Sequence, residues 1–116
     1  MRALLLVGMV AAATGACAQQ VGLSTAVFAG GRFWALEDAF ARVYGVVDAV
    51  AGYTGGSTRS ATRSTYARDG HVEAVRVRFD PSRVSYAALL DVYWRNVDPT
   101  DAGGQFTDRG AGYRPV

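Results

Sequence analysis

The sequence contains a single cysteine and no lysine among its 116 residues. The cysteine, Cys17, lies in an apolar N-terminal stretch, so the rest of the chain can form no disulfide, no thiolate metal site and no thiol nucleophile. All twelve basic residues are arginine, and the formal net charge is only +2. A net positive charge this small gives no reason to expect nucleic acid as a partner.

The first 18 residues have the layout of a secretory signal peptide. Arg2 precedes an apolar run, which is too short to span a bilayer as a stable anchor, and small residues follow it. The triplet "ACA" fits cleavage after Ala18, so we expect residues 1–18 to be removed and residues 19–116 to be exported as a periplasmic or secreted domain. Attachment of a lipid to Cys17 is the alternative, although the preceding "TGA" fits that processing pattern only in part.

Hydrophobic periodicity predicts strands and helices in the exported part of the chain. The expected strands cover residues 21–28, 46–53 and 72–79, and the expected helices cover residues 33–44 and 86–97. Ser85 is the expected N-cap of the second helix. One continuous apolar stripe of this helix is expected to face the core: Tyr86, Leu89, Leu90, Tyr93, Trp94 and Val97.

The order strand-helix-strand-strand-helix is most of a split β-α-β unit. We therefore expect an α/β fold of the α+β kind, with a two-layer ferredoxin-like core. Residues 57–70 are polar and aperiodic, which predicts a loop between the last two strands. The tail from Thr100 is rich in glycine, and its pattern predicts no further element.

Four stretches resemble the class A peptide methionine sulfoxide reductases, whose signature opens with Gly-Cys-Phe-Trp. They read "GRFW", "VAGYTGG", "GHVEAVRVRFDPSRVSYAALLDVYW" and "DPTDAGGQFTDRGAGYR". The resemblance begins at Ala26, and its most specific part is the final Gln-Phe-x-Asp-Arg-Gly-x-x-Tyr-Arg pattern.

This resemblance implies reduction of the S epimer of methionine sulfoxide, free or in oxidised proteins under repair. In such enzymes a cysteine thiolate at the helix start attacks the sulfoxide sulfur and becomes a sulfenic acid. Further cysteines convert the sulfenic acid to a disulfide, which thioredoxin or a similar thiol donor reduces. No bound cofactor or metal is implied, and we expect a monomer.

The resemblance also implies which residues form the site. Phe33 and Trp34 match the apolar wall for the substrate methyl group, and Glu73 and Tyr113 match groups that protonate or hydrogen-bond the departing oxygen. Without the motif, Phe33 and Trp34 would be read as core aromatics, Glu73 as a solvated acid and Tyr113 as an ordinary aromatic residue of the tail.

Two further site residues are implied in loops. Tyr66 matches a Thr-Tyr pair of the family, in a loop whose length and sequence differ from those usual in the family. Asp108 matches a residue of the same network, and a surface pair with Arg109 is its alternative. His71, the single histidine, is read as a structural residue.

The sequence departs from the family pattern in three ways. Arg32 occupies the position of the nucleophilic cysteine, and a guanidinium is not a nucleophile at physiological pH. No resolving cysteine is present, and Thr107 stands where many relatives carry one. The sequence stops at Val116, whereas relatives continue with another strand and helices, so we expect a core truncated at the C-terminus.

These departures leave three hypotheses for function. The first is an inactive reductase of the cell envelope, in which Arg32 replaces the catalytic cysteine. The second is a non-enzymatic binder that uses the retained aromatic residues to hold methionine sulfoxide or an exposed peptide. The third is a fragment without a stable role.

Overall fold

A computed structural model describes residues 22–116 of the chain. The expected signal peptide and Cys17 lie outside these residues. No helix within residues 22–116 has the length and apolarity that a bilayer crossing requires.

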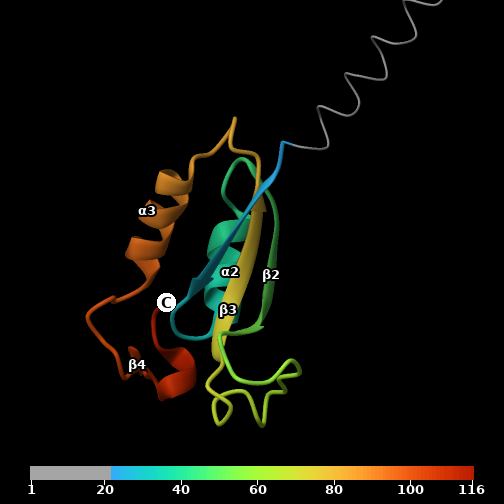
Figure 1. Cartoon of the computed structure of the whole chain (residues 1–116). Helices are drawn as coiled ribbons and strands as arrows, with labels where there is room; N and C mark the ends of the chain where they lie inside the picture. The colour runs from blue at the N-terminus through green and yellow to red at the C-terminus, as the bar shows by residue number, and fades with distance from the viewer. Residues whose placement is uncertain (1–21) are drawn as a thin grey trace, which may run out of the picture.

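Three strands form the central sheet, in the order β1-β3-β2 (Figure 1). They are β1 (Ser24–Ala29), β2 (Val46–Thr54) and β3 (Val72–Phe79). Because β3 runs antiparallel to both neighbours, β1 and β2 are parallel to each other, and helix α2 (Phe33–Ala41) forms the crossover between them. This arrangement is the expected split β-α-β unit.

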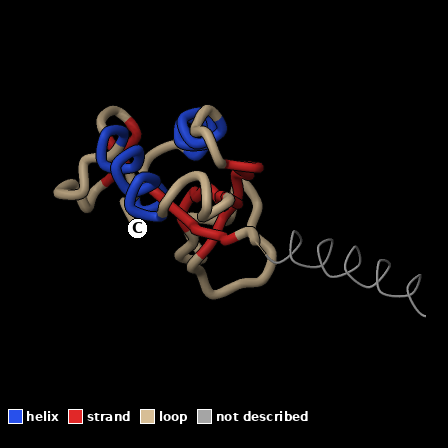
Figure 2. Tube along the Cα trace, turned by 90° about the horizontal axis from the view of Figure 1, so that it is seen from above, coloured by secondary structure: helices blue, strands red, loops and turns tan. Residues whose placement is uncertain are grey.

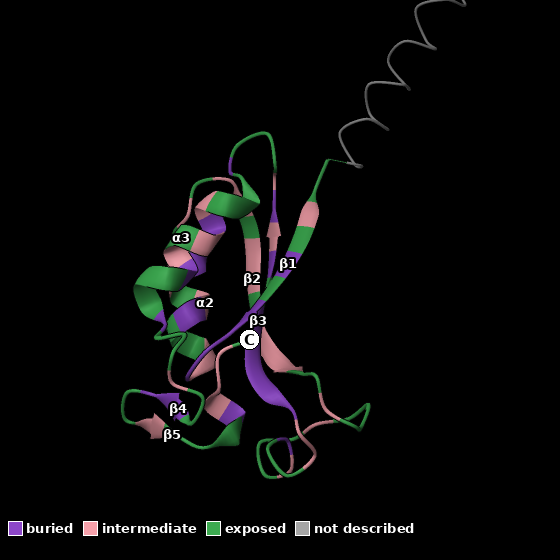
Figure 3. Ribbon diagram, turned by 60° about the vertical axis from the view of Figure 1, so that its left-hand side comes forward, coloured by how far each residue is buried: buried purple, intermediate pink, exposed green. Residues whose placement is uncertain are grey.

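Helices α2 and α3 (Tyr86–Asn96) lie on the same side of the sheet, as Figure 3 shows. Seen from above in Figure 2, the two long helices lie on one side of the central strands. Phe28 of β1 stacks on Phe40 of α2, with ring centroids 4.6 Å apart. The two-layer α/β expectation is therefore confirmed.

Buried and more exposed side chains alternate along strand β3 from Val75 to Phe79. Val75, Val77 and Phe79 are buried against the helices, whereas Arg76 is exposed. Arg78 lies on the outer face of the sheet beside Arg76 and forms an ion pair with Asp48 of β2, at 3.1 Å. The alternation follows from a strand that has one face on the core.

Helix α3 begins as expected and buries less than expected. Ser85 caps it, because its Oγ accepts a hydrogen bond of 3.0 Å from the backbone N–H of Ala88. Leu89 and Tyr93 are buried, but Tyr86 and Trp94 are each 52% exposed. The expected six-residue stripe was therefore too wide: these two aromatics lie along its margin and are only partly covered, Tyr86 by the ring of Phe28 at 6.0 Å.

The turn after α2 also differs from its expected form. The helix ends at Ala41, and the backbone N–H of Val43 then bonds to the carbonyl of Phe40 at 3.1 Å. Gly45 has a φ of +94°, a left-handed conformation that glycine adopts without strain, and it directs the chain into β2. Helix and turn together occupy the segment where helical spacing predicted a single helix.

The tail contains elements that the sequence did not predict. Two short strands, β4 (Gly104–Gln105) and β5 (Asp108–Arg109), pair with each other, and the 3₁₀ helix η1 (Ala111–Tyr113) follows. The expectation of a tail without elements was wrong. Its short strands are held by Gln105, which is 2% exposed and whose amide bonds to the backbone N–H and C=O of Asp98, each at 2.7 Å.

Backbone hydrogen bonds attach this tail to the turn between β1 and α2. The N–H of Gly31 bonds to the carbonyl of Tyr113 at 3.0 Å. Ala29 and Val116 exchange both of their backbone hydrogen bonds, at 2.9 and 3.0 Å, which is the pattern of an antiparallel pair. The tail therefore lies directly beside the first residues of α2.

Candidate active site

Arg32 stands immediately before the first residue of α2. Its backbone is extended, with φ −71° and ψ 128°, and its side chain makes no capping hydrogen bond to the helix. Gly31, with a φ of +74°, turns the chain from β1 into this position. The free N–H groups of a helix start favour negative charge, so a cation here needs compensation from another part of the chain.

Asp108 of β5 supplies that compensation. Nε of Arg32 donates a hydrogen bond of 2.9 Å to Oδ1 of Asp108. The Arg32 guanidinium also lies over the ring of Tyr113, 5.5 Å from its centroid. The hydrogen bond with Asp108 is the main cause that raises the pKa of Arg32, and the neighbouring Tyr113 adds to it. Arg32 therefore stays cationic and offers no nucleophile.

Glu73 lies under the first turn of α2. Its side chain is buried, with 6% of the residue exposed, although an acid near the start of a strand is usually solvated. One carboxylate oxygen accepts a hydrogen bond of 2.9 Å from the backbone N–H of Phe33, and the other accepts one of 3.3 Å from the hydroxyl of Tyr66. The strand thus places an acid at the helix start, as the motif implied.

Tyr66 links Glu73 to the tail. It is 7% exposed, and burial is the main cause that raises its pKa, followed by a hydrogen bond with the side chain of Tyr113. A tyrosine with a raised pKa remains protonated and can donate a hydrogen bond to an oxygen. Tyr66 thus places its hydroxyl beside Glu73, with the side chain of Tyr113 next to it.

Aromatic side chains line the open side of this network. The ring of Phe33 lies 5.5 Å from that of Tyr53, which stacks on Tyr66 at 4.5 Å. Trp34 is 64% exposed. Together with charged side chains, these aromatics enclose a cavity of about 190 Å³, lined by Arg32, Phe33, Trp34, Tyr53, Arg63 and Glu73.

The structure brings all seven residues of the expected site together. Arg32, Phe33, Trp34 and Glu73 line the cavity. The others contact these residues from behind: Tyr66 bonds to Glu73, Asp108 to Arg32, and Tyr113 lies under the Arg32 guanidinium.

The contacts of Asp108 and His71 bear on how these two residues are interpreted from the sequence. Asp108 does not pair with its neighbour Arg109, which forms its ion pair with Asp101. His71 accepts a hydrogen bond of 3.1 Å from the backbone N–H of Gly56 through Nδ1, and its other ring nitrogen lies 3.0 Å from the hydroxyl of Thr58. His71 therefore holds the loop between β2 and β3, in keeping with a structural role.

Sequence reasoning missed two residues of the cavity, Tyr53 and Arg63. Tyr53 lies in the "GYTGG" stretch at the end of β2, so it belongs to a recognised motif, but the motif does not indicate that its side chain faces the cavity. Arg63 lies in the aperiodic loop 57–70, where no pattern predicts which side chain faces the site. Only the folded loop places it there.

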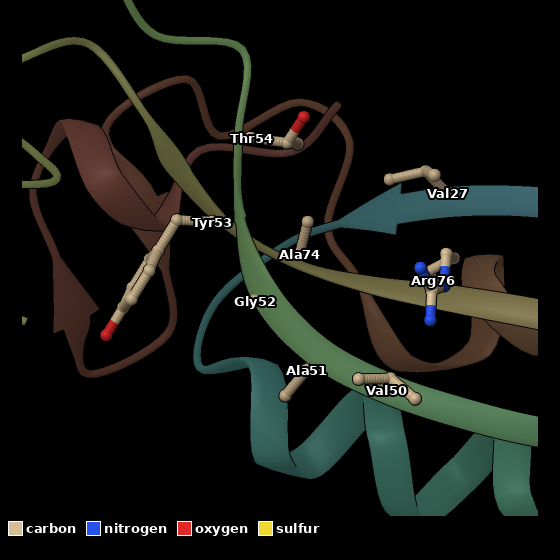
Figure 4. Close-up of a pocket in the computed structure, with 8 residues that line it drawn as sticks. All are labelled: Val27, Val50, Ala51, Gly52, Tyr53, Thr54, Ala74 and Arg76. Carbon is tan, nitrogen blue, oxygen red and sulfur yellow. The ribbon is translucent and has the colours of Figure 1, made fainter. Parts of the chain in front are cut away.

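Other features of the described residues offer less chemistry. A hollow of about 270 Å³ lies on the sheet face away from the helices, where Val27 and Val50 flank Arg76 (Figure 4). Its lining holds no carboxylate. Within residues 22–116, no three histidine, cysteine, aspartate or glutamate side chains are grouped to hold a metal ion.

Comparison with protein families decides which family this arrangement represents. The model of the family described as peptide methionine sulfoxide reductase matches residues 24–116. The chain belongs to this family. The match includes every residue of the cavity and of the network behind it.

Individual relatives agree with this membership. The chain is 53% identical over 88 residues to peptide methionine sulfoxide reductase MsrA 2 of Rhizobium meliloti, a match that covers 76% of this chain and 44% of the relative. It is 49% identical over 94 residues to the MsrA of Ligilactobacillus salivarius, covering 79% of this chain and 55% of the relative. The chain thus spans about half the length of the curated relatives it matches.

Solved structures of the family share the fold. Methionine sulfoxide reductase A of Corynebacterium diphtheriae superposes with a TM-score of 0.75 at 32% identity, covering 82% of this chain and 46% of the other. Mxr1 of Saccharomyces cerevisiae in its reduced form gives a TM-score of 0.70 at 25% identity, covering 81% of this chain and 57% of the other.

Proposed function

We propose that this chain is a catalytically silent methionine sulfoxide reductase. The family reaction would be the thiol-dependent reduction of methionine-S-sulfoxide in proteins, with thioredoxin or a similar donor as the reductant. The observation that carries the proposal is Arg32: the residue before Phe33-Trp34, at the start of α2, is a guanidinium paired with Asp108.

The electron balance of the reaction explains why Arg32 matters. Reducing a sulfoxide needs two electrons, which a thiolate supplies when its sulfur takes up the sulfoxide oxygen and becomes a sulfenic acid; that oxygen leaves as water when a second thiol reduces the sulfenic acid. Residues 22–116 contain no cysteine, and a guanidinium has no electron pair to donate at neutral pH. Removing a nucleophile from a catalytic group that acts as a unit lowers turnover by about a million-fold.

The test is direct. The purified protein is incubated with methionine-S-sulfoxide and dithiothreitol, and methionine is measured by chromatography. We expect no methionine above the blank without protein. Formation of methionine by the unmodified chain, at a rate that scales with protein concentration, would refute catalytic silence.

A specific observation favours a second function, binding without reduction. The cavity retains an aromatic wall in Phe33, Trp34 and Tyr53, and Glu73 still holds a carboxylate beside it. An apolar wall suits the methyl group of methionine sulfoxide, and Arg32, which lines the cavity and bonds to Asp108 through Nε, has further N–H groups that can donate to the sulfoxide oxygen. We propose that the cavity binds a methionine sulfoxide side chain.

Trp34 provides a probe for this binding. The chain has two tryptophans, so Trp94→Phe leaves Trp34 as the only indole. We expect the fluorescence of the Trp94→Phe variant to change saturably with N-acetyl-methionine sulfoxide and not with N-acetyl-methionine. Equal responses to the two compounds would contradict recognition of the sulfoxide.

A further inference from the structure

We propose that the cavity selects a methionine sulfoxide that carries a neighbouring carboxylate, and that Arg63 binds this carboxylate. The proposal rests on the binding function proposed above and adds the class of ligand. Free or C-terminal methionine sulfoxide has such a carboxylate, and so does an internal one followed by an acidic residue. The shared chemistry is an anionic group beside the sulfoxide side chain.

The position of Arg63 is set by a hydrogen-bonded turn. The carbonyl of Thr62 accepts hydrogen bonds from the backbone N–H groups of Thr65 and Tyr66, at 3.1 and 2.9 Å. The hydroxyls of Thr62 and Thr65 lie 2.8 Å apart. Arg63 lies inside this turn, three residues before the buried Tyr66, which stacks on Tyr53 in the cavity wall. The turn therefore presents Arg63 to the cavity from a defined backbone.

The other charges of the cavity already have partners. Arg32 is paired with Asp108, and both carboxylate oxygens of Glu73 accept hydrogen bonds, from Phe33 and Tyr66. Among residues 22–116, ion pairs join acids to Arg32, Arg42, Arg68, Arg78, Arg83 and Arg109, and Arg63 is not one of them. Arg63 is thus the cavity charge that has no acidic partner within the described chain.

The size of the cavity limits where a ligand's charge can lie. A volume of about 190 Å³ is below the range of roughly 300 Å³ and more found for drug-sized ligands, so the cavity suits one side chain. The backbone of the ligand must then remain at the opening. Arg63 lines the cavity and is exposed, which is the combination expected of a residue at that opening. A planar guanidinium binds a carboxylate through two parallel hydrogen bonds.

Three probes separate the possible ligands. N-acetyl-methionine sulfoxide has an α-carboxylate, its N-methylamide has none, and N-acetyl-methionine sulfoxide-aspartate N-methylamide carries the acid on the next residue. Binding to the Trp94→Phe protein is measured by fluorescence. We expect the first probe to bind about fivefold more tightly than the N-methylamide, in keeping with a partly exposed ion pair, and the difference to shrink at high salt. The third probe shows whether a side-chain acid can replace the terminal one.

Substitution of the two loop arginines completes the test. Arg63→Gln should remove the preference for the carboxylate, so that the first probe and the N-methylamide bind equally. Arg59→Gln is the matched control, because Arg59 is exposed in the same loop, forms no ion pair and does not line the cavity. Circular dichroism checks that both variants fold.

The outcomes are distinct. Equal affinities of the first two probes, or a preference that survives Arg63→Gln, would overturn the assignment to Arg63 while leaving sulfoxide binding intact. If no probe binds to the Trp94→Phe protein in which Arg59 and Arg63 are unchanged, both the binding function and this assignment are contradicted. A preference lost in Arg63→Gln and kept in Arg59→Gln supports it.

Discussion

Nε of Arg32 donates a 2.9 Å hydrogen bond to Oδ1 of Asp108, a residue 76 positions later in the chain. The contact joins the start of α2 to the short strand β5. It offsets the unfavourable position of a cation at a helix start, where free N–H groups carry partial positive charge. The arginine is thus accommodated by the fold, while the position can no longer supply a thiolate.

Replacing the arginine tests whether the rest of the site is competent. We expect Arg32→Cys to produce methionine from methionine-S-sulfoxide with dithiothreitol, because a thiol at a helix start has a lowered pKa. The thiolate would attack the sulfur and become a sulfenic acid, and one dithiothreitol molecule would reduce it through a mixed disulfide. Product is measured in single-turnover and multiple-turnover mixtures. Failure of a folded Arg32→Cys protein in both would mean that the site lacks more than its nucleophile.

The role of Glu73 can be measured in that active background. We expect Arg32→Cys/Glu73→Gln to be at least about a hundredfold slower than Arg32→Cys, because a group that assists departure of the oxygen is lost. Glu37→Gln is the matched control: Glu37 also accepts a backbone hydrogen bond, from Ala51 at 3.1 Å, but lies outside the cavity. An equal loss in both double variants would indicate a general effect of removing a carboxylate.

Packing between the tail and Tyr66 can be tested with two glycines. A Cβ on Gly112 would lie 2.5 Å from Cε2 of Tyr66, whereas a Cβ on Gly52 would meet nothing within 4 Å. We expect Gly112→Ala to lower the free energy of unfolding by about 1–3 kcal/mol through overpacking. Gly52→Ala should not lower it to this extent. Urea denaturation measures both, and similar midpoints for the two variants would contradict the close contact.

Alkaline pH should weaken the fold through its buried tyrosines. Burial raises the pKa of Tyr66 and of Tyr93 above the ordinary value of about 10. Below that value both stay protonated in the folded and unfolded chain, so stability does not change through them. Above it the unfolded chain loses these protons first, so the free energy of unfolding falls as pH rises.

Tyrosinate absorbance and urea denaturation, followed together, measure this effect. Tyr66→Phe should make the alkaline loss of stability shallower. Tyr44→Phe, at a residue that is 73% exposed, should not change it. If the free energy of unfolding falls equally steeply with pH in the Tyr66→Phe and unsubstituted proteins, the pKa of Tyr66 is not raised by folding.

Export is testable at the N-terminus. The apolar run followed by "ACA" leads us to propose cleavage after Ala18, so the mature protein should begin at Gln19. Mass spectrometry of protein recovered from the cell envelope measures this. A diacylglyceryl group on Cys17 would replace the proposal of a free exported protein with that of an anchored one.

The layers of the fold were predictable because their patterns are local. Alternation along β3 and the serine before α3 each report on a single element. The tail was not predictable in this way, because β4 and β5 have two residues each and no periodicity. These strands are held by hydrogen bonds between the side-chain amide of Gln105 and the backbone of Asp98, which no sequence pattern predicts.

The residues of the site differ in the same way in how far the sequence predicts them. Arg32, Phe33, Trp34 and Glu73 lie within or beside regular elements and carry a recognisable motif, so their convergence could be expected. Arg63 could not be expected, because its direction depends on a turn closed by Thr62 and Thr65 in a loop without regular structure.

The hydrogen bonds that join Tyr113 to Gly31 and Val116 to Ala29 also affect the order in which the protein forms during synthesis. A ribosome releases β1, α2, β2 and β3 well before it releases Asp108 and Tyr113. The sheet can therefore assemble while the start of α2 still lacks its neighbours from the tail. The residues that line the cavity all precede α3, whereas Asp108 and Tyr113, which contact Arg32, emerge later, so a nascent chain can form its sheet before Arg32 has these neighbours.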